Sequence, residues 1–243
     1  MGKLDGKVAL VTGGNRGIGK GIARALASEG AALALCARGA ETLQRTADEL
    51  TAGGASVLAV AADLTAEQQV HMVFARLMER FARLDILVNN AGAFDGGPLD
   101  ELPVETWDKV LAINLRAPFL CTRAALPIMK KQGGGRIINI GSISAQRVRP
   151  NSAAYNSSKH GLWGLTQVTA LEGRDFGISC GCLHPGNVLI ERRRGTGRKE
   201  DEEPMMTVEE LAETALAMAT LPAHMNMLEA IVLPVGQLYV GRG

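Results

Sequence analysis

The feature that most constrains this sequence is a glycine-rich turn between an apolar run and a helical pattern near the N-terminus. Lys7–Thr12 is apolar and of strand length, and Ile22, Ala25 and Leu26 then recur at helical spacing. The turn itself, Thr12–Gly19, reads Thr-Gly-Gly-Asn-Arg-Gly-Ile-Gly. A strand, a glycine turn and a helix in this order are typical of α/β folds that bind a phosphate at the helix N-terminus. The sequence therefore predicts a nucleotide site at this turn.

The glycines of the turn suit the binding of a nucleotide phosphate. Gly13 permits the tight turn, Gly17 lets the backbone approach a pyrophosphate, and Gly19 allows the helix to pack closely. Their spacing is G-x-x-x-G-x-G, which differs from the commonest dinucleotide pattern, G-x-G-x-x-G. The strand before the turn and the helix after it favour the nucleotide interpretation over an ordinary loop.

The rest of the chain alternates between strand-length apolar runs and helical patterns. Further strands are expected at Ala31–Ala37, Ser56–Ala61, Asp85–Val88, Arg136–Ile140, Ile178–Leu183 and Ala230–Leu233. Helices are expected up to Leu50, over Glu67–Phe81, over Val104–Lys131, from Tyr155 to about Phe176, and over Val208–Thr220. This alternation predicts βαβ units in a doubly wound parallel sheet of the Rossmann type. We expect about seven strands, helices on both faces, and a single domain over residues 1–243.

Composition excludes several classes of protein. Hydrophobic residues make up 47% of the chain but aromatic residues only 4%, which suits a parallel sheet built from small aliphatic side chains. The net charge of +1 gives no bulk attraction to nucleic acid or membrane. The first residues are polar, so we expect no signal segment and a cytoplasmic protein. Its cysteines are then expected to be buried, reduced thiols.

Tyr155 and Lys159 are the first candidates for chemistry. Residues four apart share a helix face, so the phenol and the ammonium can lie side by side. A neighbouring cation favours the phenolate form of a phenol, and a tyrosine tuned in this way can exchange a proton with a carbonyl oxygen. Taken alone, the same pair is also compatible with an ordinary surface turn of a helix.

Several further residues fall at the carboxyl ends of the expected strands or on the helices that follow. With the glycine turn, they are Asp63, Asn89–Gly92, Asn114, Ser142, Tyr155 with Lys159, and Pro185–Gly186. In this order the motifs resemble the short-chain dehydrogenase/reductase family, in its single-domain form. The likeness covers the chain from about Lys7 to the last strand, and its first half is most similar to 3-oxoacyl-carrier-protein reductases.

The resemblance implies a catalytic set. Tyr155 would be the general acid in carbonyl reduction and the base in the reverse direction, and Lys159 would favour its phenolate and bind the nicotinamide ribose. Ser142 would stabilise charge on the substrate oxygen. Asn114 would hold a water that links Lys159 to solvent. The implied function is hydride transfer between NADP(H) and a carbonyl or secondary alcohol.

The resemblance also implies a cofactor site, with Asp63 at the adenine and Asn90–Gly92 beside the adenosine ribose. The full set of expected cofactor-binding residues is Gly13, Asn15, Arg16, Gly17, Ile18, Gly19, Arg38, Asp63, Leu64, Asn90, Ala91, Gly92, Tyr155, Lys159, Pro185, Gly186 and Val188.

We expect NADP(H) to be preferred over NAD(H). NAD sites usually have a carboxylate near the end of the second strand, whereas Cys36–Gly39 contains none. Arg16 and Arg38 could instead clamp a ribose 2′-phosphate between two guanidinium groups. The alternative is that both are ordinary surface arginines.

Simpler roles stay open for other residues. Asn114 could bond an upstream carbonyl, Ser142 could be a turn residue, and Asp63 could cap the following helix. Asn89 is expected to be structural, tying its strand to a neighbour.

The chain also departs from the family at Ile190, where many members have threonine. Its C-terminus lacks their usual Asp-Gly-Gly, and the sequence does not define the substrate.

Two predictions concern assembly and substrate access. The resemblance implies a homotetramer, or a homodimer, built through the helices that carry Asn114 and Tyr155 and through the last helix and strand. The apolar run Gly161–Leu165 fits burial against a second copy of the chain.

Residues 187–206 lie where the family has its substrate lid. Within them, Glu191–Glu203 is densely charged, and we expect it to order on ligand binding. Its arginines could select an acidic substrate, or could simply keep the loop solvated.

Other functions are less well supported. A non-catalytic dinucleotide sensor on the same fold would have no need of Asn114, Ser142, Tyr155 and Lys159 together. Nucleic-acid binding would depend on basic residues near 192–199, but acidic residues follow them at once. Cys180, Cys182 and His184 could supply some of the ligands of a metal site, but the sequence has no second cluster of ligand residues to complete it, and we expect no metal.

Overall fold

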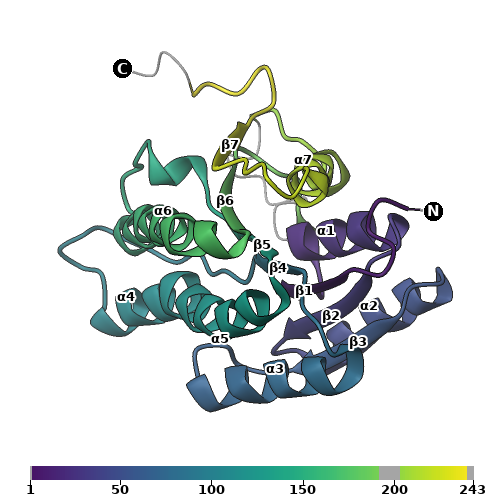
Figure 1. The fold of residues 1–243 in the computed structure, drawn as a ribbon. Helices are drawn as coiled ribbons and strands as arrows, with labels where there is room; N and C mark the ends of the chain where they lie inside the picture. The colour runs from purple at the N-terminus through teal and green to yellow at the C-terminus, as the bar shows by residue number, and fades with distance from the viewer. Residues whose placement is uncertain (1, 192–202, 240–243) are drawn as a thin grey trace.

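A sheet of seven parallel strands lies at the centre of the protein, seen in the computed structural model in Figure 1. The structure describes residues 2–191 and 203–239. The strand order is β3-β2-β1-β4-β5-β6-β7, so the order reverses between β1 and β4. The strands are β1 (Val8–Thr12), β2 (Ala32–Ala37), β3 (Val57–Ala61), β4 (Ile86–Asn89), β5 (Gly135–Ile140), β6 (Ile178–Pro185) and β7 (Glu229–Val232). This confirms the doubly wound parallel sheet.

The helices connect successive strands and cover both faces of the sheet (Figure 1). The α-helices are α1 (Gly17–Ser28), α2 (Ala40–Ala52), α3 (Glu67–Phe81), α4 (Val104–Leu111), α5 (Ala117–Gln132), α6 (Ala153–Gly173) and α7 (Val208–Thr220). Shorter turns are the π-helical η1 (Ala112–Arg116) and the 3-10 turns η2 (Ile143–Ala145) and η3 (Arg174–Phe176). Helices α1, α2 and α7 pack on one face, and α3 and α5 on the other.

Alternation of side chains along the strands builds a hydrophobic core on each face. Strand β1 is buried throughout: Ala9 and Val11 point to the core beneath α1, α2 and α7, while Leu10 points to the core beneath α3 and α5. Because both faces are covered, the central strands are continuously apolar rather than alternating. The low aromatic content fits this core, which consists mainly of Ala, Val, Leu and Ile side chains.

The helical region expected at Val104–Lys131 differs from the prediction in one respect. It is not a continuous α-helix, because the π-helical turn η1 separates α4 from α5. Asn114 lies in this turn and is 1% exposed. Single π turns inside α-helices widen the backbone locally and are frequent at functional sites. Sequence periodicity cannot distinguish such a turn from the helix around it.

The two ends of the expected lid are joined at its base. Val188 pairs with Met206 in an isolated parallel bridge, supported by hydrogen bonds from Leu189 N to the Met206 carbonyl (2.8 Å) and from Met206 N to the Asn187 carbonyl (3.0 Å). The charged residues 192–202 lie outside the described residues. Both the motion of the lid and the role of its arginines therefore stay predictions.

Candidate active site

The glycine turn after β1 has the backbone that was expected of it. Gly13 and Gly17 have φ values of +64° and +51°, in the left-handed region that favours glycine. A Cβ atom on Gly19 would lie 2.3 Å from the Gly13 carbonyl oxygen, so no side chain fits there. The Gly13 N–H donates to the Cys36 carbonyl at 2.7 Å, which ties the turn to β2.

Thr12 joins the turn to the loop after β4, at the point where the strand order reverses. Its hydroxyl oxygen accepts the backbone N–H groups of Asn90 (2.9 Å) and Ala91 (3.0 Å). The Asn90 side chain returns a bond to the Thr12 carbonyl at 2.9 Å. Ligands of open α/β sheets bind at this switch point. The sequence placed Thr12 at the end of a strand and at the start of the glycine turn, but did not indicate that it joins the two loops.

An anion already lies at the N-terminus of α1. The Gly17 N–H donates to the Glu191 carboxylate at 3.2 Å, and the Ile190 side chain lies against Gly17. The N-terminus of a helix attracts negative charge, so the position of this carboxylate also suits a phosphate oxygen. The residues present therefore fit a dinucleotide pyrophosphate.

The expected 2′-phosphate clamp has an open approach. Arg16 precedes α1, Arg38 follows β2, and both side chains are exposed. The Asn15 amide donates to the Thr42 hydroxyl at 2.9 Å, and Thr46 donates to the Asn15 carbonyl at 3.0 Å. These bonds hold the glycine turn against α2, so Asn15 has a structural role, and its expected contact with the cofactor stays a prediction.

Asp63 and Leu64 follow β3. The Asp63 carboxylate accepts bonds from the N–H (3.0 Å) and the hydroxyl (2.8 Å) of Thr65, which makes a local turn before α3. Asp63 is not the cap of that helix, as the simpler alternative had it, because the N-cap residue of α3 is Ala66. The Leu64 side chain is buried in the core beneath α3 and α5. Only its backbone is therefore available to a cofactor.

Tyr155 and Lys159 lie on one face of α6, as their spacing predicts. The Lys159 ammonium nitrogen is 5.6 Å from the centre of the Tyr155 ring and donates to the Ile140 carbonyl at 2.8 Å. Lys159 is only 5% exposed, so this bond places a buried cation at the end of β5. Phe94, which follows the Asn-Asn-Ala-Gly turn, packs edge-on against Tyr155 with ring centres 5.1 Å apart. Sequence reasoning did not identify Phe94.

Asn114 bridges the loop after β4 and α6. Its side-chain oxygen accepts the Ala93 N–H at 2.8 Å, and its amide donates to the Ala93 carbonyl (2.9 Å) and to the Ser158 hydroxyl (3.1 Å). The bond to the Ala93 carbonyl is the simpler role that was considered for Asn114, a hydrogen bond to a carbonyl earlier in the chain. The side chain thereby fixes the segment that carries Phe94 relative to the helix that carries Tyr155.

Ser142 follows β5 and is 9% exposed. Its hydroxyl oxygen accepts the Ser144 N–H at 3.1 Å and so begins the η2 turn, which packs against α6. Asn89 behaves as expected: its amide donates to the Asn139 side chain on β5 at 2.8 Å, which ties the two strands together.

Pro185 and Gly186 lie at the end of β6, which continues two residues beyond the expected Leu183. A Cβ atom on Gly186 would lie 2.1 Å from the Gln237 side-chain oxygen, and that oxygen accepts the Asn187 N–H at 2.8 Å. Val188 is buried at the base of the expected lid. The C-terminal segment thus supports the backbone of the expected cofactor loop.

The described cysteines are free and buried, as expected. Burial raises the pKa of the Cys36 thiol and of the Cys182 thiol to about 12 each, so neither is a nucleophile near neutral pH.

Over residues 2–191 and 203–239, no three His, Cys, Asp or Glu side chains lie close enough together to bind a metal ion. In the same part of the chain, no helix is long and apolar enough to span a membrane.

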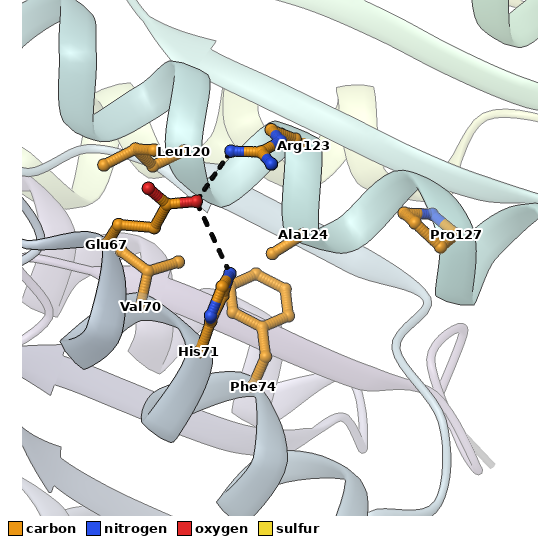
Figure 2. Close-up of a pocket in the computed structure, with 8 residues that line it drawn as sticks. All are labelled: Glu67, Val70, His71, Phe74, Leu120, Arg123, Ala124 and Pro127. Carbon is orange, nitrogen blue, oxygen red and sulfur yellow. Dashed lines mark hydrogen bonds and ion pairs between the residues drawn. The ribbon is translucent and has the colours of Figure 1, made fainter.

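A separate groove of about 410 Å³ lies between α3 and α5 (Figure 2). Glu67 on its rim pairs with Arg123 at 2.7 Å and lies 3.9 Å from the His71 ring nitrogen, so its polar side chains already contact one another. None of its lining residues belongs to the expected site. The residues of the expected site lie instead at the carboxyl edge of the sheet.

The fold and site define a dinucleotide-binding α/β protein with a Tyr–Lys pair at the carboxyl end of its central strands. Residues 7–201 match the family model described as short chain dehydrogenase. The chain therefore belongs to the short-chain dehydrogenase family, as its motifs suggested.

Relatives and solved structures agree with this assignment. A D-beta-hydroxybutyrate dehydrogenase of Rhizobium meliloti (strain 1021) is 37% identical, over 88% of this chain and 91% of the relative. A crystal structure from Agrobacterium tumefaciens, of a protein assigned as a gluconate dehydrogenase, is 32% identical with a TM-score of 0.90, over 94% of this chain and 95% of the other. A metagenomic short-chain oxidoreductase in complex with NADP is 34% identical with a TM-score of 0.84, over 96% and 98%.

Proposed function

We propose that this chain is an NADP(H)-dependent oxidoreductase that interconverts a carbonyl compound and a secondary alcohol, with Tyr155 as its general acid and base. The observation that carries the proposal is the Tyr155–Lys159 pair, with the cation 5.6 Å from the ring centre and anchored to Ile140. A sensor of dinucleotides would need the glycine turn but not a buried cation beside a phenol.

The cofactor would lie across the switch point of the sheet. The Gly17 amide would bind its pyrophosphate in place of Glu191, and Arg16 and Arg38 would bind the 2′-phosphate. Asn90–Gly92 would line the adenosine ribose. When bound, NADPH supplies the hydride. The crystal structure of a relative with NADP supports the choice of cofactor.

The protein would supply the proton and stabilise charge on the oxygen. Ser142 would donate a hydrogen bond to the substrate carbonyl, and Tyr155 would donate the proton that completes the alcohol. Lys159 beside the ring would favour the phenolate left behind. Because the Asn114 amide already donates to Ala93 and Ser158, a water that links Lys159 to solvent would donate to an Asn114 oxygen, of the side chain or of the backbone.

Turnover assays test this function. Purified protein would be given NADPH or NADH with a panel of ketones, and NADP or NAD with a panel of alcohols. The panel includes 3-oxo and 3-hydroxy acids because a relative carries the name D-beta-hydroxybutyrate dehydrogenase. We expect turnover of at least one carbonyl with NADPH. Tight NADPH binding without turnover of any compound would favour the sensor instead.

A further inference from the structure

His184 lies directly behind Ser142 and contacts its backbone. It occupies the penultimate position of β6 and is fully buried, at 0% exposed. Its Nδ1 atom is 2.9 Å from the Ser142 carbonyl oxygen and 3.3 Å from the Ser142 backbone nitrogen. One ring nitrogen is thus within hydrogen-bonding distance of both polar backbone atoms of the residue expected to bind the substrate oxygen.

The surroundings of His184 fix the plane of its ring. Gly141 precedes Ser142, and a Cβ atom there would lie 2.5 Å from Nδ1, so only glycine lets the ring approach. On α6, Trp163 packs edge-on against the imidazole with ring centres 5.8 Å apart and an interplanar angle of 76°. The ring therefore cannot turn away from Ser142 without rearranging α6.

The other ring nitrogen faces a carboxylate. His184 Nε2 lies 3.4 Å from Glu229 Oε1 on β7. The same carboxylate oxygen accepts a hydrogen bond from the Gln146 amide, and the Glu229 side chain is 32% exposed. Nε2 makes no hydrogen bond with this oxygen, so Glu229 acts on the ring through its negative charge, which favours the ring form that carries a proton on Nε2.

The proton on Nδ1 decides which Ser142 atom the ring can bind. Without that proton, Nδ1 accepts the Ser142 N–H; with it, Nδ1 donates to the Ser142 carbonyl. Burial lowers the pKa of His184 below its ordinary value, while the Ser142 carbonyl and Glu229 act to raise it and Lys159 and His160 to lower it. The neutral ring therefore prevails at neutral pH, and the charged ring forms only on acidification.

We propose that His184, oriented by Glu229, is a positioning residue for Ser142. The neutral ring holds the Ser142 N–H and with it the direction of the Ser142 hydroxyl. Protonation moves the bond to the Ser142 carbonyl and misaligns the hydroxyl. This role rests on the proposed carbonyl chemistry, since it acts through the residue that would bind the substrate oxygen.

The coupling can be measured without any substrate. Nuclear magnetic resonance of protein with isotope-labelled histidine and serine would follow His184 and the Ser142 amide through a pH titration. We expect a neutral His184 protonated on Nε2, a midpoint below the ordinary histidine value, and a Ser142 amide signal that changes with the same midpoint. Glu229→Gln keeps the shape but removes the charge, so the midpoint should fall. Glu213→Gln on the exposed face of α7 is the matched control and should leave the midpoint unchanged.

Turnover supplies the second measurement. In the wild-type protein kcat should fall on acidification with the same midpoint, and Glu229→Gln should move both midpoints together. His184→Asn should remove this acid limb and lower kcat about tenfold, because a misplaced group loses much of its effect, with little change in the NADPH Kd. Glu229→Gln keeps the test available if His184→Asn does not fold.

Either of two results would overturn the inference. One is a Ser142 amide signal that does not change as His184 titrates; the other is a pH midpoint of kcat that is the same in Glu229→Gln as in the wild-type protein. Absence of any turnover in the wild-type protein would count against the proposed function. The magnetic resonance titration would still decide whether His184 and Ser142 are coupled.

Discussion

The Lys159 ammonium nitrogen faces the Tyr155 ring from 5.6 Å while it donates to the Ile140 carbonyl at 2.8 Å. Helical spacing alone would allow Lys159 to extend into solvent, as lysines usually do. The bond to the last residue of β5 instead holds the cation at the edge of the sheet. The charge beside the phenol is therefore fixed by the sheet as well as by the helix.

We predict that Lys159→Met lowers kcat about a hundredfold, within the usual contribution of a general acid–base group, because the phenolate loses its neighbouring cation. NADPH binding should weaken only modestly. Lys109→Met is the matched control, since Lys109 lies on α4 and pairs with Asp95 at 3.6 Å. Equal kcat values for the two variants would contradict the role given to Lys159.

Cofactor preference tests the exposed arginines around the phosphate turn. We predict that the wild-type protein has a higher kcat/KM with NADPH than with NADH. Replacing both Arg16 and Arg38 with alanine should reduce that preference about 10²- to 10⁴-fold, since hydrogen bonds to charged groups contribute about 1.5–3 kcal/mol each. Arg45→Ala, on the exposed side of α2, should leave it unchanged. Equal use of the two cofactors by the wild-type protein, or a preference for NADH, would rule out the clamp.

Glu191 should compete with the cofactor for the N-terminus of α1. We predict that Glu191→Gln tightens NADPH binding about two- to fivefold, because a charge at a helix N-terminus contributes about 0.3–1 kcal/mol. The measurement is the Kd from NADPH fluorescence at low salt, and the effect should shrink as salt is added. Glu213→Gln again controls for the change in net charge. Weaker binding in Glu191→Gln would show that Glu191 assists the cofactor.

Exposed apolar side chains on α5 and α6 support the predicted association of copies of this chain. Phe119 on α5 is 45% exposed, and Val168 and Leu171 on α6 are 49% and 58% exposed. We predict a tetramer or dimer by light scattering at micromolar concentration. Val168→Glu should reduce the mass of the assembly measured in this way, whereas Met72→Glu on α3 should leave that mass unchanged. A monomeric wild-type protein would refute the prediction.

Local signals explain why much of the fold could be predicted. The bounds of α3 and α7 agree with the expected helices, and α7 begins at a capping box in which Thr207 and Glu210 exchange side-chain and backbone hydrogen bonds. The doubly wound parallel sheet follows from the alternation of apolar runs with helical patterns and from right-handed βαβ crossovers. These features depend on residues close together in the chain.

Features built from distant residues could not be predicted in the same way. His184 and Ser142 are 42 residues apart, and nothing in either local pattern indicates that they touch. The π turn at Asn114 has the same apolar periodicity as the helices on either side. The contact of Glu191 with Gly17 joins segments 174 residues apart. Such contacts depend on how loops meet at the carboxyl edge of the sheet.

The most direct test of the proposed chemistry is the kcat of Tyr155→Phe with the best carbonyl substrate of the wild-type protein. The substitution removes only the hydroxyl that would donate the proton, and the ring can still pack against Phe94. We predict a loss of about 10²- to 10⁴-fold in kcat, with an unchanged unfolding temperature and NADPH Kd. A folded Tyr155→Phe protein that binds NADPH and keeps most of the wild-type kcat would contradict the assignment of Tyr155 as the general acid.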